Sequence, residues 1–377
     1  MPMPSDEISG LTGLPLERRA ALSPSSPLPP PLSKRARFAQ TLDTLGLIDR
    51  MLWLRTRLGV RALTVLTYHR VGEPGDSGEF DPEVFDVTPQ ELDRQIGLIK
   101  AHGSLIGLDD LRRFIRGDPR LPKNPVMITF DDGYRDNYDV ALPILERHGA
   151  EALFFIPTAF PDAGRLFWWD RISLLLRRCT REAVELDYPR KLTLAPRRDP
   201  RAAAVLLCKA VKLTPNIDLG RLWDELERAT GVVFSAEEER DLAEKTIMGW
   251  NKVRSLVARG MSVQSHSHSH KVLNAFTPAE AEADLARSAA LLGEVLGGAI
   301  ETASYPVGYT VDGQLRGAAA AAGFAIGFTN RTGLGDLDRL DPLNVPRVGM
   351  DARSVGALYK LLLLTGDRLP HRPRRWA

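Results

Sequence analysis

Two short stretches of the chain bring together side chains that could bind a metal ion and move protons. Asp131 and Asp132 directly follow an apolar run, within the sequence Thr-Phe-Asp-Asp-Gly. Adjacent carboxylates repel each other unless a positive charge keeps both ionised, and a bound cation supplies that charge. His266 and His270 stand four residues apart in Ser-His-Ser-His-Ser-His, so both rings can face one point if the chain coils there. Carboxylate and imidazole ligands together are typical of a divalent metal of the zinc type.

A third candidate is His69, which ends the first apolar run in Thr-Tyr-His-Arg. A solvated acidic turn, a His-rich surface loop and a structural histidine are the alternative interpretations of the three stretches. All three nevertheless stand at the carboxyl ends of predicted strands, where the active sites of α/β barrels lie. Their coincidence favours a functional site.

The chemistry that such a set supports is metal-assisted hydrolysis of an amide. An Asp-His-His ligand set leaves positions for water and substrate, and the metal lowers the pKa of its water and polarises a carbonyl oxygen. A free carboxylate accepts the proton of the attacking water, and an imidazolium protonates the departing amine. The carboxylate left over from the Asp pair and His69 fit these two roles.

A parallel barrel would position these residues. Short apolar runs predict strands, and helical patterns such as 88–102, 138–148 and 278–296 alternate with them, which indicates a closed or nearly closed α/β barrel. From about 162 to 247 the pattern becomes almost wholly helical and predicts an insertion. This insertion either shapes the substrate cleft through Trp168 and Trp169 or forms a lid with purely structural aromatics. The seven predicted strands are 62–68, 126–130, 152–157, 261–265, 302–306, 324–329 and, more weakly, 343–350.

Outside the barrel, which we place at 61–350, the composition changes. Residues 1–37 are rich in proline and serine and predict a flexible arm, and 38–60 predict an amphipathic helix with a basic end. That helix either packs on the barrel or lies on a membrane surface. Residues 351–377 predict a C-terminal helix and a basic tail with Arg372, Arg374 and Arg375.

Composition narrows the partners and the compartment. The 377 residues include 50 Lys and Arg against 48 Asp and Glu, a net charge of +2 that gives no case for nucleic acid. Two cysteines do not make a disulfide framework and favour a reducing compartment. No secretory signal or membrane-spanning run is recognisable. We therefore expect a cytoplasmic protein, with peripheral contact at the inner membrane face left open.

These motifs resemble the polysaccharide deacetylase family with the NodB-homology domain, also called carbohydrate esterase family 4. Thr129–Gly133 matches its first motif, TFDDG, and His266–His270 matches its second. Ser304–Gly308 is similar to the third, a Pro-x-Gly turn beside the groove, and Pro346-Arg347-Val348 resembles a final barrel strand. The resemblance covers about residues 60–160 and 248–350. It implies a distorted (β/α)7-type barrel, here with a helical insertion.

The resemblance also implies site roles and an activity. The enzyme would be a metal-dependent de-N-acetylase that acts on an N-acetylated carbohydrate. Among divalent metals, Zn²⁺ is the one we expect. Asp131 would be the general base, and Asp132, His266 and His270 the metal ligands. The turn at Tyr305, Pro306 and Val307 would line the groove, with the Val307 N–H stabilising the oxyanion.

Two departures from the family pattern affect the base and the acid. Ser304 stands where many members carry an arginine that orients the base, and Arg347 is the candidate substitute. No late Leu-x-His motif supplies an acid, but Tyr68-His69 is similar to the Tyr-His pair of permuted members, which include deacetylases of poly-N-acetylglucosamine. His268 fits the variable middle of the second motif and is not counted as a ligand.

Three functional hypotheses follow. The first is a de-N-acetylase acting on an oligosaccharide, a polysaccharide or a lipid-linked glycan precursor. The second is a catalytically inactive carbohydrate-binding relative, and the third is an amidase of the same superfamily with a non-sugar substrate. Convergence of base, acid and ligands on one cleft distinguishes the first from the second, and an aromatic-lined groove favours sugar over other amides.

Overall fold

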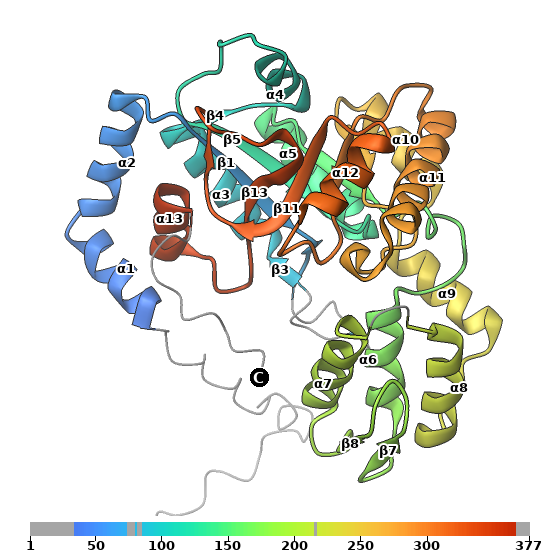
Figure 1. Ribbon diagram of the computed structural model, residues 1–377. Coiled ribbons are helices and arrows are strands. Elements are labelled where there is room, and N and C mark those ends of the chain that lie inside the picture. Colours follow the sequence, from blue (N-terminus) through green and yellow to red (C-terminus); the bar gives the residue numbers. More distant parts are fainter. Residues whose placement is uncertain (1–33, 74–79, 81–84, 215–216, 367–377) are drawn as a thin grey trace, which may run out of the picture.

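A computed structural model describes residues 34–73, 80, 85–214 and 217–366 of the chain (Figure 1). Seven parallel strands close into a barrel, because the first strand pairs with both the second and the last. This confirms the fold class predicted from the apolar runs, and each strand lies within three residues of its expected bounds. In order around the barrel the strands are β1 (Ala62–Tyr68), β5 (Pro125–Phe130), β6 (Leu153–Ile156), β9 (Ser262–Ser265), β10 (Thr302–Ser304), β11 (Ile326–Thr332) and β13 (Val345–Gly349).

The strands are apolar on both faces because both faces are covered. Along β5, Met127 packs inside the barrel with Phe155 and Phe328, whereas its neighbour Ile128 packs in the outer layer. This alternation is the two-residue period of a strand, and it explains why all six residues of β5 are buried. Helices pack against the outer layer, namely α3 (Pro89–His102), α5 (Leu142–His148), α10 (Trp250–Ala258), α11 (Pro278–Leu296) and α12 (Gly313–Ala321).

Helix boundaries follow local signals. Thr88 caps α3 by accepting a hydrogen bond from the N–H of Glu91 at 3.2 Å, with Pro89 in the first turn. Helix α5 starts later than the pattern predicts because a π-helical turn, Asn137–Ala141, precedes it. The smaller elements are β2 (Arg70–Val71), β3 (Phe85–Val87), β4 (Ser104–Leu105), α4 (Leu108–Ile115), β12 (Gly335–Asp336) and the 3₁₀ turns Leu273–Ala275 and Pro342–Asn344.

The insertion between β6 and α10 forms a lobe with its own hydrophobic core, beneath the barrel in Figure 1. Its helices pack through buried residues such as Ile172, Leu207 and Leu222. The lobe is not wholly helical, because two three-residue strands form an antiparallel hairpin, and strands so short show no readable alternation. Its elements are α6 (Trp168–Arg178), β7 (Val184–Leu186), β8 (Leu192–Leu194), α7 (Pro200–Lys212), α8 (Leu219–Thr230) and α9 (Ala236–Thr246).

Two helices, rather than the single expected one, precede the barrel. Helices α1 (Lys34–Thr44) and α2 (Leu47–Leu58) are separated at Gly46, whose left-handed φ of 65° breaks the helix. They pack beside α13 (Gly356–Thr365), and Lys360 of α13 binds Asp43 and Asp49 at 3.0 and 2.8 Å. Among the described residues, no helix has the length and apolarity that crossing a bilayer requires. Residues 1–33 of the expected arm, and the basic tail with Arg372, Arg374 and Arg375, lie outside the described residues.

Candidate active site

One cleft of about 450 Å³ receives the candidate residues from several strand ends. It is lined by His69 after β1, Asp131 and Asp132 after β5, and His266 and His270 after β9. Their backbones are unusual: six non-glycine residues in the described part of the chain have positive φ, and four belong to the cleft segments. These four are Asp132, Ser267, His270 and Val307, with φ between 53° and 74°. Such strain persists where the fold holds a functional geometry in place.

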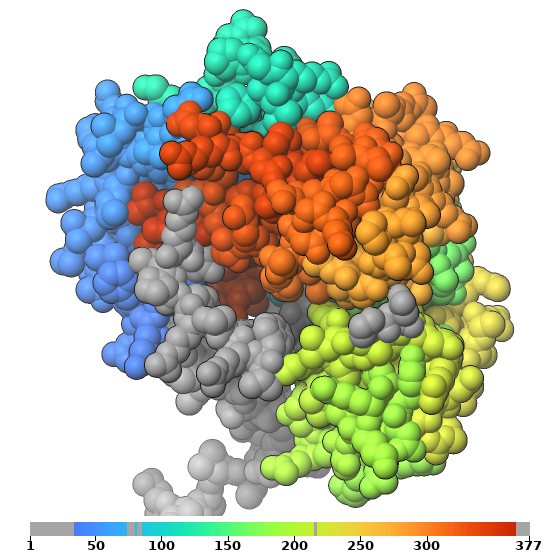
Figure 2. Space-filling model, in the orientation of Figure 1, coloured from blue at the N-terminus to red at the C-terminus, as the bar shows by residue number. Residues whose placement is uncertain are grey.

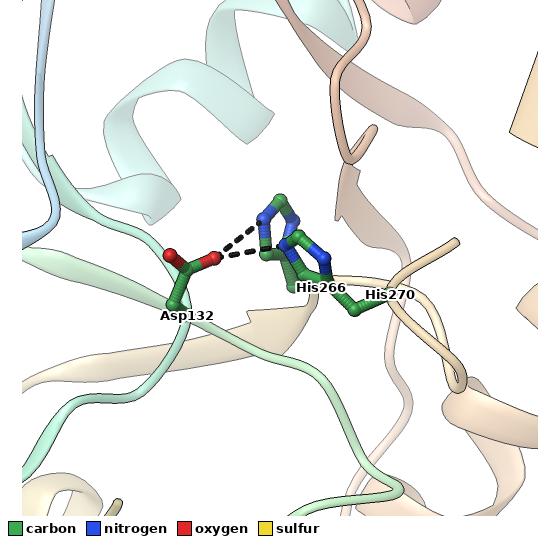
Figure 3. A group of neighbouring side chains, drawn as sticks. All are labelled: Asp132, His266 and His270. Atoms are coloured by element: carbon green, nitrogen blue, oxygen red, sulfur yellow. Dashed lines mark hydrogen bonds and ion pairs between the residues drawn. The ribbon is translucent and has the colours of Figure 1, made fainter. Parts of the chain in front are cut away.

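Asp132, His266 and His270 point toward one another, as Figure 3 shows. The Oδ1 atom of Asp132 lies 2.9 Å from Nε2 of His270 and 3.3 Å from Nε2 of His266. The loop after β9 makes this possible by coiling, with the hydroxyl of Ser267 accepting a hydrogen bond from the N–H of His270 at 3.1 Å. All three residues are buried, and their potential ligand atoms lie within 4.8 Å of one another.

The hydrogen bonds around this group fit a divalent cation. Nδ1 of His266 lies 2.9 Å from the carbonyl oxygen of Ser304 and donates to it, which fixes the ring with Nε2 facing Asp132. Nε2 and the carboxylate oxygen lie 3.3 Å apart, so a divalent cation beside them could be bound by both. Burial lowers the pKa of His270, which favours the neutral imidazole that a metal binds. Burial opposes ionisation of Asp132, but His270 and His266 nevertheless bring its pKa well below the usual range.

Asp131 is held separately, by an arginine from the last strand. Arg347 Nη1 and Nη2 donate to its two carboxylate oxygens at 2.8 and 2.7 Å, and both side chains are 1% exposed. Burial favours the protonated acid, but the attraction of Arg347 outweighs it and lowers the pKa of Asp131. Ser304 adds a hydrogen bond from its hydroxyl at 3.3 Å. The structure thus places the guanidinium of Arg347 at the position expected from the final-strand motif.

Arg347 is itself fixed from behind. Its Nη2 also donates to Oδ1 of Asn330 at 2.6 Å, and its Nε donates to the carbonyl of Thr329 at 3.1 Å. A planar guanidinium with this many acceptors has one orientation, so the carboxylate of Asp131 has one orientation as well. Sequence reasoning did not find Asn330.

His69 borders the same cleft and has a carboxylate partner. Its Nδ1 lies 3.0 Å from Oδ2 of Asp86 on β3, and its backbone N–H donates to the same oxygen at 2.5 Å. Burial opposes the charged ring, but the nearby carboxylates, Asp86 first and then Asp132 and Asp131, outweigh burial and raise the pKa of His69 to about 9. The side chain is 40% exposed and therefore accessible from the cleft. Sequence reasoning missed Asp86, whose signal is an acid between two apolar residues, Phe85 and Val87, in a short alternating run.

The segment after β1 is anchored by a polar network. Arg70 Nε donates to Asp136 at 2.8 Å, and the N–H of Val71 donates to the same carboxylate at 3.0 Å. Asn137 Nδ2 donates to the carbonyl of His69 at 2.7 Å. These contacts fix the backbone that carries His69, so its ring has a defined position relative to Asp131.

The insertion contributes an aromatic wall. Trp168 and Trp169, at the start of α6, both line the cleft, and the ring of Trp169 lies 4.6 Å from that of His270. Trp169 Nε1 donates to the hydroxyl of Tyr134 at 2.8 Å, which ties the insertion to the barrel. Of the two interpretations of the insertion, the structure therefore favours the one in which it shapes the cleft.

The turn after β10 corrects part of the expectation. Val307 lines the cleft, and its N–H donates to no acceptor among the described residues. Tyr305, however, is fully buried in the outer core, and its hydroxyl donates to the carbonyl of Leu343 at 3.1 Å. The side chain of Tyr305 therefore supports the turn instead of lining the groove, and Pro306 beside it is buried as well. His268 is not part of the ligand group and does not line the cleft; its Nδ1 lies 2.9 Å from the hydroxyl of Thr158.

Comparisons with known proteins agree with this geometry. A family model described as polysaccharide deacetylase matches residues 118–186 and 227–327. YxkH of Bacillus subtilis (strain 168), whose name assigns it to the polysaccharide deacetylases, is 28% identical over 109 residues, 29% of this chain. The match spans only 36% of that relative.

Two solved structures share the fold. The Streptococcus pyogenes deacetylase PplD in complex with acetate superposes with a TM-score of 0.51 at 17% identity, covering 80% of this chain and 96% of that one. IcaB from Ammonifex degensii gives 0.51 at 19% identity, covering 81% and 97%. The segments that the family model matches carry Asp131, Asp132 and both buried histidines, and the barrel is the fold that the two solved structures share; over these segments the chain matches the polysaccharide deacetylase family.

Proposed function

We propose that this protein is a metal-dependent hydrolase that removes the acetyl group from an N-acetylated sugar. One observation carries the proposal. An arginine-held carboxylate, a carboxylate-held imidazole and a three-residue ligand set all face a single cleft. Hydrolysis of an amide needs a base for the water, an acid for the amine and a charge that stabilises the oxyanion, and these groups match the three needs.

Asp132, His266 and His270 would hold the metal, and zinc suits one carboxylate and two imidazoles. When bound, the metal would lower the pKa of water and polarise the acetyl carbonyl. The chain's own contribution here is orientation. The carbonyl of Ser304 fixes the His266 tautomer, and Trp169 packs against the His270 ring.

Asp131 accepts the proton of the attacking water. Its two hydrogen bonds to Arg347 keep Asp131 ionised and prevent its carboxylate from rotating toward the ligand set. In this orientation Oδ2 of Asp131 lies 3.8 Å from Nε2 of His266. A base that is ionised before substrate arrives needs no reorganisation during the reaction.

His69 donates a proton to the departing amine. An amide nitrogen leaves poorly unless it is protonated, so the acid must carry its proton at the working pH. Asp86 meets this need, because it raises the pKa of His69 and fixes Nδ1 as the protonated partner. The unpaired N–H of Val307 supports its role as a donor to the oxyanion.

The cleft walls favour a sugar as the substrate. Trp168 and Trp169 form one wall, and Tyr309, 62% exposed, stands at the rim. Aromatic faces beside polar groups suit sugar rings, whose C–H faces stack while their hydroxyls make hydrogen bonds. An oligosaccharide, a polysaccharide chain end and a lipid-linked glycan precursor all fit this description.

Ser304 gives no support to an inactive carbohydrate-binding relative. Its hydroxyl and the guanidinium of Arg347 both contact Asp131, so the orientation that another arginine would provide is already present. No residue of the proposed constellation is replaced by one that cannot act.

Acetate release from N-acetylglucosamine oligomers by the full-length protein tests the proposal. Zinc-dependent release that falls at least ~100-fold in Asp131→Asn and His69→Ala would support it. Asp109→Asn is the matched control, because this carboxylate is 79% exposed on α4, outside the cleft. Zinc binding with release only from non-sugar amides would replace the sugar with another amide, and absence of zinc binding would overturn the ligand set.

A further inference from the structure

Helix α2 exposes a continuous apolar stripe. Leu47, Met51, Leu54 and Leu58 recur at i, i+4, i+7 and i+11, which places them on one face of the helix. They are 37%, 48%, 47% and 70% exposed. Together with neighbouring exposed residues of the same hairpin they form the outer face of α1–α2: Phe38, Leu45, Leu47, Met51, Trp53, Leu54, Leu58 and Val60.

The neighbouring face of α2 already packs on the barrel. Ile48 and Leu52 are 0% and 2% exposed in the core that includes α13. Buried Arg55 donates to the hydroxyl of Thr64 in β1 at 3.1 Å and to the carbonyl of Leu364 at 3.2 Å. A surface helix normally has one apolar stripe, which faces the core, so a second and exposed apolar stripe is a candidate contact surface. The outer face therefore needs a second apolar partner.

The charge on this hairpin is complementary to an anionic partner. Arg50 and Arg57 flank the stripe and form no ion pair with any residue that the structure describes. The guanidinium of Arg57 lies 5.1 Å from the ring centre of Trp53, which is 56% exposed. The only two acids of the hairpin, Asp43 and Asp49, are bound by Lys360 of α13. The outer face consequently presents arginines without compensating carboxylates.

We infer that the outer face of α1–α2 binds the surface of an anionic lipid bilayer, with α2 lying in the interface. Exposed leucines enter the acyl boundary, Trp53 sits at the headgroups, and Arg50 and Arg57 contact lipid phosphates. In Figures 1 and 2, α1 and α2 form an outer margin of the molecule, so a flat surface can approach them. Docking of this kind is independent of the proposed hydrolysis, because no residue of the outer face lines the cleft.

Flotation of the full-length protein with vesicles tests the inference without measuring activity. We expect association with phosphatidylcholine vesicles that contain about one third phosphatidylglycerol, and weaker association with phosphatidylcholine alone. Leu54→Glu should reduce binding at least tenfold, because it places a carboxylate in the apolar stripe. Leu206→Glu is the matched control, since Leu206 is also a partly exposed helical leucine, 38% exposed on α7. It should bind as the unmodified protein does.

A second variant separates charge from apolar contact. Arg50→Ala with Arg57→Ala should weaken binding to the anionic vesicles by about fivefold per arginine and leave the neutral vesicles unaffected. Absence of flotation, or equal binding by the Leu54 and Leu206 variants, would overturn the inference. The inference would also be overturned if the unmodified protein bound no vesicles and Leu54→Glu changed it from a dimer into a monomer. A protein that bound vesicles only after residues 1–33 were removed would overturn it as well.

Discussion

Replacing Asp86 with asparagine should lower the pH at which the enzyme loses activity on the alkaline side. Asp86 Oδ2 accepts both the backbone N–H of His69 and its Nδ1–H. The substitution Asp86→Asn keeps an oxygen at this position but removes the negative charge. His69 acts as an acid only while protonated, so a lower pKa moves the loss of the active form to lower pH.

The size of the effect follows from the geometry. The structure raises the pKa of His69 from 6.5 to about 9, with burial opposing and Asp86 as the largest favourable contribution. Solvent screens part of this attraction, because the His69 side chain is 40% exposed. We therefore expect the alkaline limb to move down by about one to two pH units, which means a loss of kcat/KM of about five- to fiftyfold near pH 9. Near pH 6 the two proteins should differ little.

The assay is the pH dependence of kcat/KM for acetate release, run on two substrates. With an N-acetylated sugar the leaving amine needs a proton, so the variant should show the shifted limb. With an activated aryl acetate the leaving phenolate needs none, and the two profiles should coincide. Any charge bound at Asp132, His266 and His270 acts on both proteins alike, so their difference isolates Asp86.

Asp93→Asn provides the matched control. Asp93 lies 3.1 Å from Nε2 of His148, a second His–Asp pair on the outside of the barrel, and its removal should leave the profile unchanged. Coincident alkaline limbs for the Asp86 variant and the unmodified protein on the sugar substrate would refute His69 as the acid. An equal shift on the aryl ester would show that Asp86 acts on another group.

Four further expectations concern the base, the metal, the core and a buried acid. Arg347→Lys keeps the charge but loses the paired hydrogen bonds to Asp131, so steady-state kinetics should show kcat falling ~10–100-fold with KM within about twofold; unchanged turnover would contradict the orienting role. A chelator should abolish acetate release and lower the melting temperature, zinc should restore both, and His270→Ala should fail to respond to zinc. Ile128→Ala, at a position with 0% exposure, should cost about 2–5 kcal/mol in urea unfolding, and a smaller loss would mean that the outer layer can collapse into the space. Burial raises the pKa of Asp170 to about 7, so the folded state keeps a proton that the unfolded state releases near pH 4; the free energy of unfolding should fall as pH rises between these values, and Asp170→Asn should remove that slope.

The barrel could be read from the sequence because its strands are apolar on both faces. Runs such as Ala62–Tyr68 and Pro125–Phe130 carry that signal locally, and all seven strands were predictable from it. The division of 38–60 into two helices was not, because Leu42, Leu45, Ile48 and Leu52 continue a helical period across Gly46. Only the left-handed backbone of Gly46 in the folded chain reveals the break.

In the candidate site, too, some residues can be predicted from a local sequence motif and others cannot. Asp131, Asp132, His266 and His270 stand in compact motifs, so their types and spacing suffice to propose chemistry. Their supporting partners come from elsewhere: Asp86 stands between two apolar residues of a short strand, and Asn330 lies in the polar second half of β11. Burial and pairing, which the sequence does not show, decide whether such residues face solvent or support the site.

Closure of the barrel explains how a histidine near the start of the chain can take the place of one near its end. The last strand, β13, pairs with β1, and β1 pairs with β5. A residue that follows β1 therefore stands between Arg347 on β13 and Asp131 after β5. It is one strand away, around the barrel, from a residue that follows the final strand. Proton donation requires only that the imidazole lie across the bound substrate from the base, and the ring offers that position from either side of the β13–β1 junction. In the proposed mechanism, the early Tyr68-His69 pair would thus replace a late Leu-x-His motif while Asp131, Arg347 and the proposed ligands keep their strands.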